Sequence, residues 1–401
     1  MSQVSGAYNY LPKNSEEYKW RFWATVPIYP YSKRRTIRRE VLKDTIWTFE
    51  QLQGIFYVVV PIRMTVIRLE AGGLLVYAPV APTPECIGLM QQLVEQYGEV
   101  KYIILPTISG LEHKTFVGPF ARKFPQSIVY VAPKQWSFPL DLPLSWLGFP
   151  AQRTQVLPPD SSQTPLAEEF DYAILGDIDL RLGRFAEVAL LHKRSQTLLV
   201  TDTIVSIPIQ PPQIIEQALY PLLFHARESA KDPIADTPEN RLRGWKRICL
   251  FSMYFRSSVL EVPSFSKTLG DAWRSPDKNS HAYWGLYPFK WQPNWEECYS
   301  TLRADGSLLV APILQTLILN RAPHETLRWA SAIAENWQFN RLIACHFDSP
   351  VDTTPKEFLQ AFAFLDNDNY QPRKIPAADL ETLKAIDSLL LKLAIVPPPK
   401  I

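Results

Sequence analysis

Glycine is scarce in this sequence, and the motifs that bind nucleotides through glycine-rich loops are missing. Only 15 of the 401 residues are Gly, and neither GxGxxG nor GxxxxGK[ST] occurs. Both motifs need glycine so that the backbone can approach a phosphate closely. We therefore expect no nucleotide cofactor. No signature of DNA or RNA binding is present either, so no nucleic-acid partner is expected.

Cysteine is also rare, and its spacing excludes two kinds of site. The four residues Cys86, Cys249, Cys298 and Cys345 are far apart and form no CxxC pair. This pattern fits neither a disulfide scaffold nor a cysteine-based zinc ribbon. Free thiols in a cytoplasm-like compartment are the prediction.

Long hydrophobic segments are missing as well. The first twenty residues contain no apolar segment of the kind found in secretory signals. The longest nearby apolar run, residues 54–62, spans nine residues and contains Pro61. A membrane-spanning helix needs about 20 residues. We expect a cytoplasmic protein, with attachment to a membrane surface left open.

What the chain does contain is enough apolar sequence for a large core. Apolar residues make up 46% of the chain, the net charge is only +2, and Pro (36) and Trp (12) are abundant. The main charge feature is a basic cluster at Lys33, Arg34, Arg35, Arg38 and Arg39. It indicates either a patch for an anionic surface or a solvated basic face.

Hydrophobic periodicity predicts alternating strands and helices, and therefore an α/β fold. In the first half we expect strands at 55–60, 64–69, 74–77, 100–105 and 127–132, with helices at 84–97 and 113–123. A hairpin is predicted at 185–191 and 197–201. In the second half we expect helices at 211–226, 240–254, 323–336, 355–365 and 377–394, and a strand at 341–345.

Metal-competent side chains follow three of these predicted strands. Glu112 and His113 begin the helix after strand 100–105, Asp202 ends the strand at 197–201, and His346 follows strand 341–345. Each alone has an ordinary structural explanation, as a helix cap, a turn residue or a core histidine. Ligands commonly bind at the carboxyl ends of strands in α/β sheets. Together these residues predict a site for one divalent metal, Zn, Fe or Mn.

The order and setting of these residues resemble the metallo-β-lactamase family. That family's first motif, HxHxDH, corresponds to residues 108–113, which read ISGLEH. The acid–histidine pair is kept, with Glu for Asp, and the first two histidines are replaced. A third family histidine would fall near Gly183-Arg184 and is missing, with His192 at the wrong end of that hairpin. The resemblance therefore implies one retained metal half-site made of Glu112, His113, Asp202 and His346.

The resemblance also implies an αββα sandwich with a long helical insert. Segments such as PTISGLEHKTFVGPFARKFP and LLVTDT look like an uncharacterised branch, a domain of unknown function, that we associate with cyanobacteria and plastids. The expected organisation is an N-terminal basic arm (1–50), the first part of the core (51–204), an aromatic-rich helical insert (205–320), the last part of the core (321–365) and a tail with a helix (366–401).

Two functions from different classes fit this sequence. The first is a mononuclear metal-dependent hydrolase of unknown substrate. The second is a non-catalytic scaffold or assembly factor that binds a protein or membrane partner through residues 205–320 or the basic cluster 33–39. A mononuclear iron oxidoreductase is a further alternative, because two His and one carboxylate match the ferrous triad. The hydrolase requires the four predicted ligands to converge, whereas the scaffold predicts an exposed apolar patch of several hundred Å² on the insert.

Overall fold

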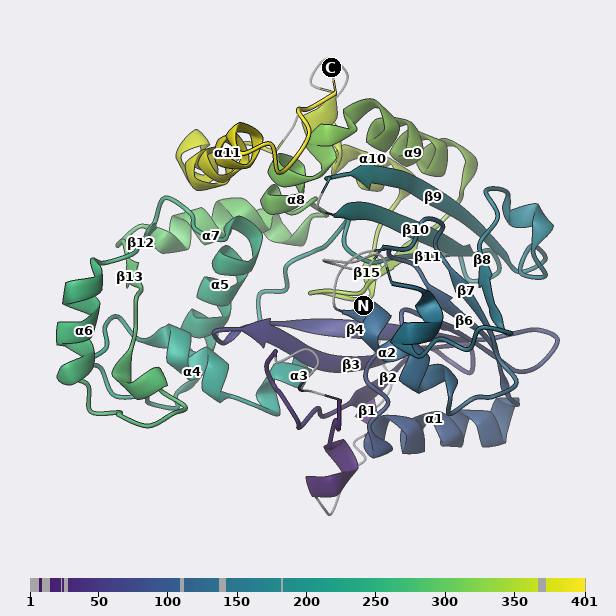
Figure 1. Ribbon diagram of the computed structural model, residues 1–401, viewed down its shortest axis with the longest axis horizontal. Helices are drawn as coiled ribbons and strands as arrows, with labels where there is room; N and C mark the ends of the chain where they lie inside the picture. The colour runs from purple at the N-terminus through teal and green to yellow at the C-terminus, as the bar shows by residue number, and fades with distance from the viewer. Residues whose placement is uncertain are drawn as a thin grey trace.

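The computed structural model describes residues 7–8, 15–22, 24, 28–108, 112–136, 142–181, 183–366 and 373–400. Two β-sheets pack face to face, with helices on their outer faces (Figure 1). The first sheet has eight strands in the order β1 to β8, and the second has five in the order β15-β14-β11-β10-β9. The α/β sandwich expected from the sequence is confirmed.

The first sheet is antiparallel from β1 to β5 and parallel from β5 to β8. Parallel neighbours need a crossover, and two helices supply it. These are α1 (Pro84–Tyr97) between β5 and β6, and α2 (His113–Ala121) between β6 and β7. The strands are β1 (Ala7–Tyr8), β2 (Ile37–Leu42), β3 (Ile46–Ile55), β4 (Val58–Arg68), β5 (Leu74–Tyr77), β6 (Val100–Leu105), β7 (Ile128–Val131) and β8 (Thr154–Val156).

The second sheet carries two of the predicted metal ligands. Its strands are β9 (Phe170–Asp179), β10 (Arg184–His192), β11 (Thr197–Val200), β14 (Arg341–Ala344) and β15 (Val351–Asp352). Strands β11 and β14 pair in parallel, although some 140 residues separate them in the sequence. The helices α9 (Pro323–Asn336) and α10 (Pro355–Gln360) cover the outer face through apolar residues such as Trp329 and Phe358.

Apolar side chains from both sheets form the central core. Tyr77 and Ile104 of the first sheet meet Val188 and Leu199 of the second, all buried. Because both faces of the sheet are covered there, a central strand such as β5 (LLVY) is a continuous apolar run. The charged residues that are fully buried within the sheets, such as Arg63 and Glu187, have specific partners, as described below.

The insert is helical and has its own core. It contains α3 (Gln213–Glu216), α4 (Tyr220–Ala226), α5 (Pro238–Tyr254), β12 (Leu260–Glu261), α6 (Phe265–Trp273), β13 (Lys290–Trp291), α7 (Trp295–Arg303) and α8 (Pro312–Leu317). Its core surrounds Trp245 and includes Leu52, Tyr57 and Val59 from the β3–β4 hairpin. The tail helix α11 (Ala377–Lys392) joins this unit, where Asp379 accepts from the backbone N–H of Ser258 at 3.0 Å.

Short 3₁₀ turns complete the chain. They are η1 (Ser15–Tyr18), η3 (Leu144–Leu147), η4 (Ser161–Gln163), η5 (Tyr283–Gly285), η6 (Ala304–Gly306), η7 (Leu319–Arg321) and η8 (Ala363–Leu365). Among the helices that the structure describes, none combines the length and apolarity needed to cross a bilayer.

The segment for which we expected an N-terminal arm is part of the first sheet over residues 37–50. Its basic cluster is only partly exposed to solvent. Arg34 and Arg38 are buried and donate to the carbonyls of Leu52 and Leu89, both at 2.9 Å. Arg35 pairs with the buried Glu85 at 3.1 Å. These arginines therefore have structural partners within the fold. The charge pattern of the sequence alone does not show them.

Candidate metal site

Asp202 and His346 lie at equivalent positions of two adjacent parallel strands. The register pairs Val200 of β11 with Ala344 of β14, and each site residue follows two positions later. The backbone N–H of Cys345 still donates to the carbonyl of Val200 at 3.1 Å. The carboxyl ends of parallel strands meet at one edge of a sheet, so the two side chains are brought together.

Glu112 reaches the same point from the other sheet. It lies after β6, directly before His113, the first residue of α2. The two sheets are joined here: the N–H of Val188 donates to the carbonyl of Pro106, and the hydroxyl of Tyr77 donates to the carbonyl of Val188, both at 2.8 Å. The motif residues 109–111 lie outside the described residues. The longer side chain of Glu, compared with Asp, points into the site.

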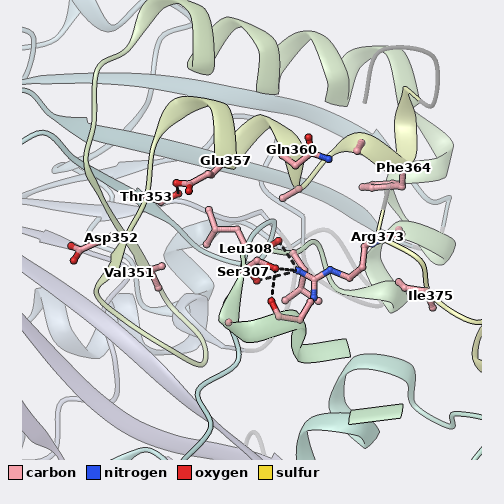
Figure 2. Close-up of a pocket in the computed structure, with 16 residues that line it drawn as sticks. Ser307, Leu308, Val351, Asp352, Thr353, Glu357, Gln360, Phe364, Arg373 and Ile375 are labelled. Atoms are coloured by element: carbon pink, nitrogen blue, oxygen red, sulfur yellow. Dashed lines mark hydrogen bonds between the residues drawn. The ribbon is translucent and has the colours of Figure 1, made fainter. Parts of the chain in front are cut away.

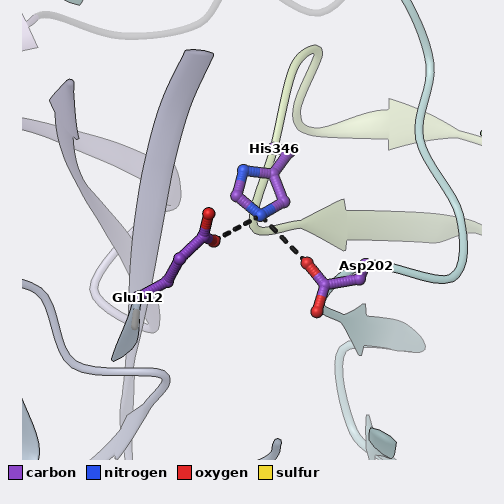
Figure 3. Close-up of side chains that lie close together, drawn as sticks. All are labelled: Glu112, Asp202 and His346. Atoms are coloured by element: carbon purple, nitrogen blue, oxygen red, sulfur yellow. Dashed lines mark hydrogen bonds and ion pairs between the residues drawn. The ribbon is translucent and has the colours of Figure 1, made fainter. Parts of the chain in front are cut away.

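The three side chains converge on one histidine nitrogen (Figure 3). Nε2 of His346 lies 3.0 Å from a carboxylate oxygen of Glu112 and 3.0 Å from one of Asp202. Nδ1 of His346 lies 3.0 Å from the carbonyl oxygen of Pro61. A carbonyl only accepts hydrogen bonds, so Nδ1 carries the hydrogen. Nε2 then faces two carboxylates, an arrangement that requires a positive charge there, either a proton or a metal ion.

The pKa values agree with this interpretation. Burial of His346 acts to lower its pKa, but Glu112 and Asp202 override burial and raise the pKa well above the usual value. Burial of Glu112 acts to raise its pKa, whereas His346 lowers it to about 2. Nearby Arg34 has its pKa lowered to about 10 by burial, opposed by the charge of Glu112. These shifts favour an anionic Glu112 beside a cationic position at His346.

His113 is close to this group but outside it. The group whose ligand atoms all lie within 4.8 Å of one another contains Glu112, Asp202 and His346 among the described residues. Nδ1 of the buried His113 lies 3.0 Å from the carbonyl of Pro79, so this nitrogen donates. Its Nε2 is buried without a hydrogen-bond partner in the described part of the chain. Burial lowers the pKa of His113, so this nitrogen presents a lone pair.

Glu187 of β10 fixes the loop that carries Asp202. Its buried carboxylate accepts from the N–H groups of Thr201 (3.0 Å), Asp202 (2.8 Å) and Thr203 (2.9 Å), and from the Thr203 hydroxyl (2.7 Å). Burial raises the pKa of Glu187, and the charge of Asp202 raises it further. With two donors on each oxygen, all of its acceptor positions are used, so the group acts as an anion.

Arg63 of β4 fixes the loop that carries His346. Its guanidinium pairs with Glu50 at 3.0 Å and donates to the carbonyl of Phe347 at 2.8 Å and to that of Ala344. Phe347 has a positive φ of 55°, which is unfavourable for a bulky residue. Arg63 thus stabilises a strained turn beside His346.

Sequence analysis missed both Glu187 and Arg63. The available signal was a single charged residue inside an apolar strand, in FAEVALL and in VPIRMTV. At the position where the family's third histidine is missing, Arg184 pairs with Asp177 at 2.7 Å. His192, at the other end of the hairpin, contacts Ser195 Oγ at 2.7 Å and lies away from the site.

The three donors fit a divalent metal ion. The three donor atoms lie within 4.8 Å of one another, which is close enough for a single ion to contact all of them. A donor set of one imidazole and two carboxylates suits Zn, Mn or Fe. The Nδ1–H of His346 on Pro61 is the outer contact that metal-binding histidines usually make.

A cavity of about 370 Å³ lies elsewhere, between residues 304–315, 351–364 and 373–375 (Figure 2). None of the predicted site residues lines it. Two of its three charged side chains already have partners: Arg373 donates to the carbonyl of Leu308 at 3.1 Å, and Glu357 accepts from the N–H of Thr354 at 2.8 Å. The third, Asp352, is exposed to solvent. We therefore place the candidate site at Glu112, Asp202 and His346.

Solved structures similar to this chain belong to the metallo-β-lactamase fold. A metal-soaked Flv1 flavodiiron core from Synechocystis sp. PCC6803 is 11% identical with a TM-score of 0.41, and the match covers 83% of this chain and 61% of that one. The metallo-β-lactamase FIM-1 from Pseudomonas aeruginosa, in its mono-zinc form, is 9% identical with a TM-score of 0.36, covering 83% and 94%. DIM-1 metallo-β-lactamase exposed to ceftazidime is 11% identical with a TM-score of 0.36, covering 82% and 97%.

The sequence itself identifies a family. No curated protein matches it significantly. The model of the family described as a domain of unknown function (DUF4336) matches residues 43–364, which is more than half of the chain and includes all four predicted ligands. The chain belongs to the DUF4336 family.

Proposed function

We propose that this protein is a mononuclear metal-dependent hydrolase. The observation that carries the proposal is the convergence of Glu112, Asp202 and His346, with the proton of His346 on the nitrogen that faces away from the carboxylates. Once a metal ion displaces the proton on Nε2, this geometry directs a histidine lone pair and two carboxylate oxygens to one point. Such an arrangement is common in metal sites and unfavourable without a cation.

A bound metal ion would lower the pKa of its water and polarise a substrate oxygen. Residues of this chain would hold the ion and leave it accessible. Glu112 and Asp202 are partly exposed, so a substrate has access from solvent, whereas His346 is buried behind them. Glu187 and Arg63 keep the two ligand loops in place. The buried lone pair of His113 provides a further acceptor next to the site.

The test is the metal content of the purified full-length protein, measured by inductively coupled plasma mass spectrometry. We expect about one equivalent of Zn, Fe or Mn and loss of that metal in the Asp202→Ala/His346→Ala variant. His324→Ala, which removes an exposed histidine, is the matched control and should keep the metal. Metal-free wild-type protein, even after incubation with each ion, would refute the proposal. Iron as the bound metal would favour the oxidoreductase alternative.

The second candidate, a scaffold without catalysis, is favoured by one observation. The insert exposes large apolar side chains, among them Phe265, Trp273 and Trp284. A partner would then bind through residues 205–320. The cluster at 33–39 is a poorer surface, because Arg34 and Arg38 are buried.

We also propose a cytoplasm-like compartment, in a cyanobacterium or a plastid. All four cysteines are free and buried, as expected where thiols stay reduced. Cell fractionation tests this location, and recovery of the protein from an oxidising compartment would contradict it.

A further inference from the structure

Helix α6 exposes an apolar stripe that the metal site does not explain. Phe265, Leu269 and Trp273 follow one another at four-residue spacing, so they share one face of the helix. Their exposed fractions are 77%, 47% and 81%. The neighbouring positions Thr268 and Ala272 are buried and attach the helix to the insert. The apolar residues of the stripe are therefore exposed while a different face of the helix packs against the insert.

A fourth exposed apolar residue, Trp284, lies next to this stripe. Trp284 in η5 is 67% exposed. The backbone of the following residue, Gly285, approaches α6 so closely that a Cβ there would lie 2.7 Å from the carbonyl oxygen of Ala272. The end of α6 and η5 are thus packed together. We call Phe265, Leu269, Trp273 and Trp284 the α6 stripe.

The position and size of the α6 stripe limit what can cover it. Helix α6 lies at the outer end of the insert, far from the two sheets (Figure 1). If a full aromatic side chain presents about 200 Å², the three aromatic residues expose on the order of 450 Å². A stable protein interface buries about 800 Å² on each partner. The stripe is small for a dimer but suits insertion of a few side chains into a lipid surface.

The charges around the α6 stripe favour an anionic partner. Lys267, Arg274 and Lys278 are exposed and form no ion pair within the described residues, and the ammonium of Lys278 lies 5.2 Å from the ring centre of Trp273. By contrast, the nearby carboxylates of Glu261 and Asp271 are paired with Lys290 and Lys231. Asp277 is partly exposed and also forms no ion pair with the residues that the structure describes. Three unpaired cations therefore face one unpaired carboxylate, and the charge available to a partner is net positive. Trp and Phe beside Lys and Arg are typical of helices that lie in the interface of an anionic bilayer.

We propose that the α6 stripe binds the surface of an anionic lipid bilayer, with Phe265, Trp273 and Trp284 inserted between the headgroups and the surrounding cations held at the lipid phosphates. This binding does not depend on the metal site. It attaches the protein through the end of the insert, and the sandwich with its ligand loops stays in solution.

The test is co-sedimentation of the full chain with vesicles of phosphatidylcholine alone or mixed equally with phosphatidylglycerol. We expect binding to the anionic vesicles that weakens as salt is raised. The Phe265→Ser/Trp273→Ser variant should lose roughly tenfold or more of this binding. Trp146→Ser is the matched control, because Trp146 in η3 is equally exposed but belongs to another element. Since all these side chains are exposed, equal melting temperatures verify that the variants fold.

A charge variant tests the second half of the proposal. Lys267→Glu/Lys278→Glu should weaken binding to anionic vesicles while all apolar residues remain. Two results would overturn the proposal: no binding to either vesicle, or equal loss in the Trp146→Ser control. A wild-type dimer in solution that Phe265→Ser/Trp273→Ser dissociates, without vesicle binding, would identify a second copy of the chain as the occupant and would also overturn it.

Discussion

Glu187 shows how strongly the candidate site depends on one buried residue that does not itself belong to the ligand group. Its carboxylate accepts four hydrogen bonds from the loop that carries Asp202. In Glu187→Gln, the side-chain NH₂ group would replace one of the accepting oxygens. It is itself a donor, so the N–H groups that face it would lose their acceptor. We expect the free energy of unfolding to fall by about 1–3 kcal/mol and the metal affinity by about 10- to 100-fold.

Denaturant unfolding and metal titration measure these two effects separately. Glu168→Gln, an exposed substitution with the same chemical change, is the control and should alter neither quantity. A Glu187→Gln protein with unchanged metal affinity would show that the loop around Asp202 keeps its geometry without this carboxylate. The residue would then contribute only to stability.

Single residues also show what the sequence can and cannot predict about the site. The strand ends at Asp202 and His346 were visible as apolar runs that stop at a polar residue. The contact of His346 Nδ1 with Pro61 was not, because it joins residues 285 positions apart. The unpartnered Nε2 of His113 was equally invisible. Local pattern identifies the ligand types, whereas their protonation and orientation depend on long-range packing.

At the scale of elements, the most accurate predictions are those in which a helix-capping residue and the hydrophobic periodicity indicate the same boundary. The predicted helix at 84–97 is confirmed as α1 with the same bounds, because Thr83 caps it and Pro84 fixes its first turn. The hydroxyl of Thr83 accepts from the N–H of Cys86 at 3.2 Å. We expect Thr83→Ala to lower the free energy of unfolding by about 1 kcal/mol.

Thr83→Ser is the matched variant for this cap, because it keeps the hydroxyl and removes only a methyl group. Denaturant unfolding should place it closer to wild type than Thr83→Ala. If the two variants were equally unstable, the buried methyl group and not the hydrogen bond would be responsible.

Proline explains two errors in the predicted elements. The sequence predicts a break between strands 55–60 and 64–69, but β4 runs from Val58 to Arg68 through Pro61. This is possible because β5 pairs only with residues 65–68, so β4 has a strand partner on one side at Pro61. Conversely, the helix predicted at 211–226 is divided into α3 and α4. Pro221 cannot lie inside a helix, and α4 begins beside it.

At the scale of the whole molecule, the β3–β4 hairpin couples the insert to the sandwich. Phe49 and Met64 belong to the core of the first sheet, whereas Leu52, Tyr57 and Val59 belong to the core of the insert. Unfolding of either unit would expose apolar surface of the same hairpin. The helical pattern of this segment was visible in the sequence, but its attachment to the hairpin was not, because the hairpin precedes it by about 150 residues.

Metal binding should stabilise this coupled unit. An ion present at 100 times its Kd raises the free energy of unfolding by about 2.7 kcal/mol when it binds only the folded state. Addition of a chelator should therefore lower the melting temperature of the wild-type protein. In Asp202→Ala/His346→Ala the chelator should have no effect, and an equal shift in that variant would mean that the ion binds elsewhere.

Acid should weaken the protein through its buried neutral histidines, above all His225. In α4, its Nε2–H donates to the carbonyl of Phe56 at the hairpin tip, at 3.1 Å. Burial, together with the charges of the nearby Arg227 and Arg247, lowers the pKa of His225 from 6.5 to about 3. Between these two values the unfolded chain binds a proton that the folded protein does not. The stability that His225 contributes is present above pH 6.5 and falls by about 1.4 kcal/mol per pH unit below it.

His225→Gln isolates this effect, since the amide can still donate to Phe56 but does not titrate. We expect the difference in unfolding free energy between wild type and variant to be constant above pH 7 and to shift in favour of the variant as pH falls. His192, whose pKa burial lowers to about 4, adds a similar dependence in both proteins, so it cancels in the comparison. Parallel stability curves from pH 7 to 5 would mean that His225 takes up its proton equally in the folded and unfolded states. The contact between α4 and the hairpin tip would then be open to water.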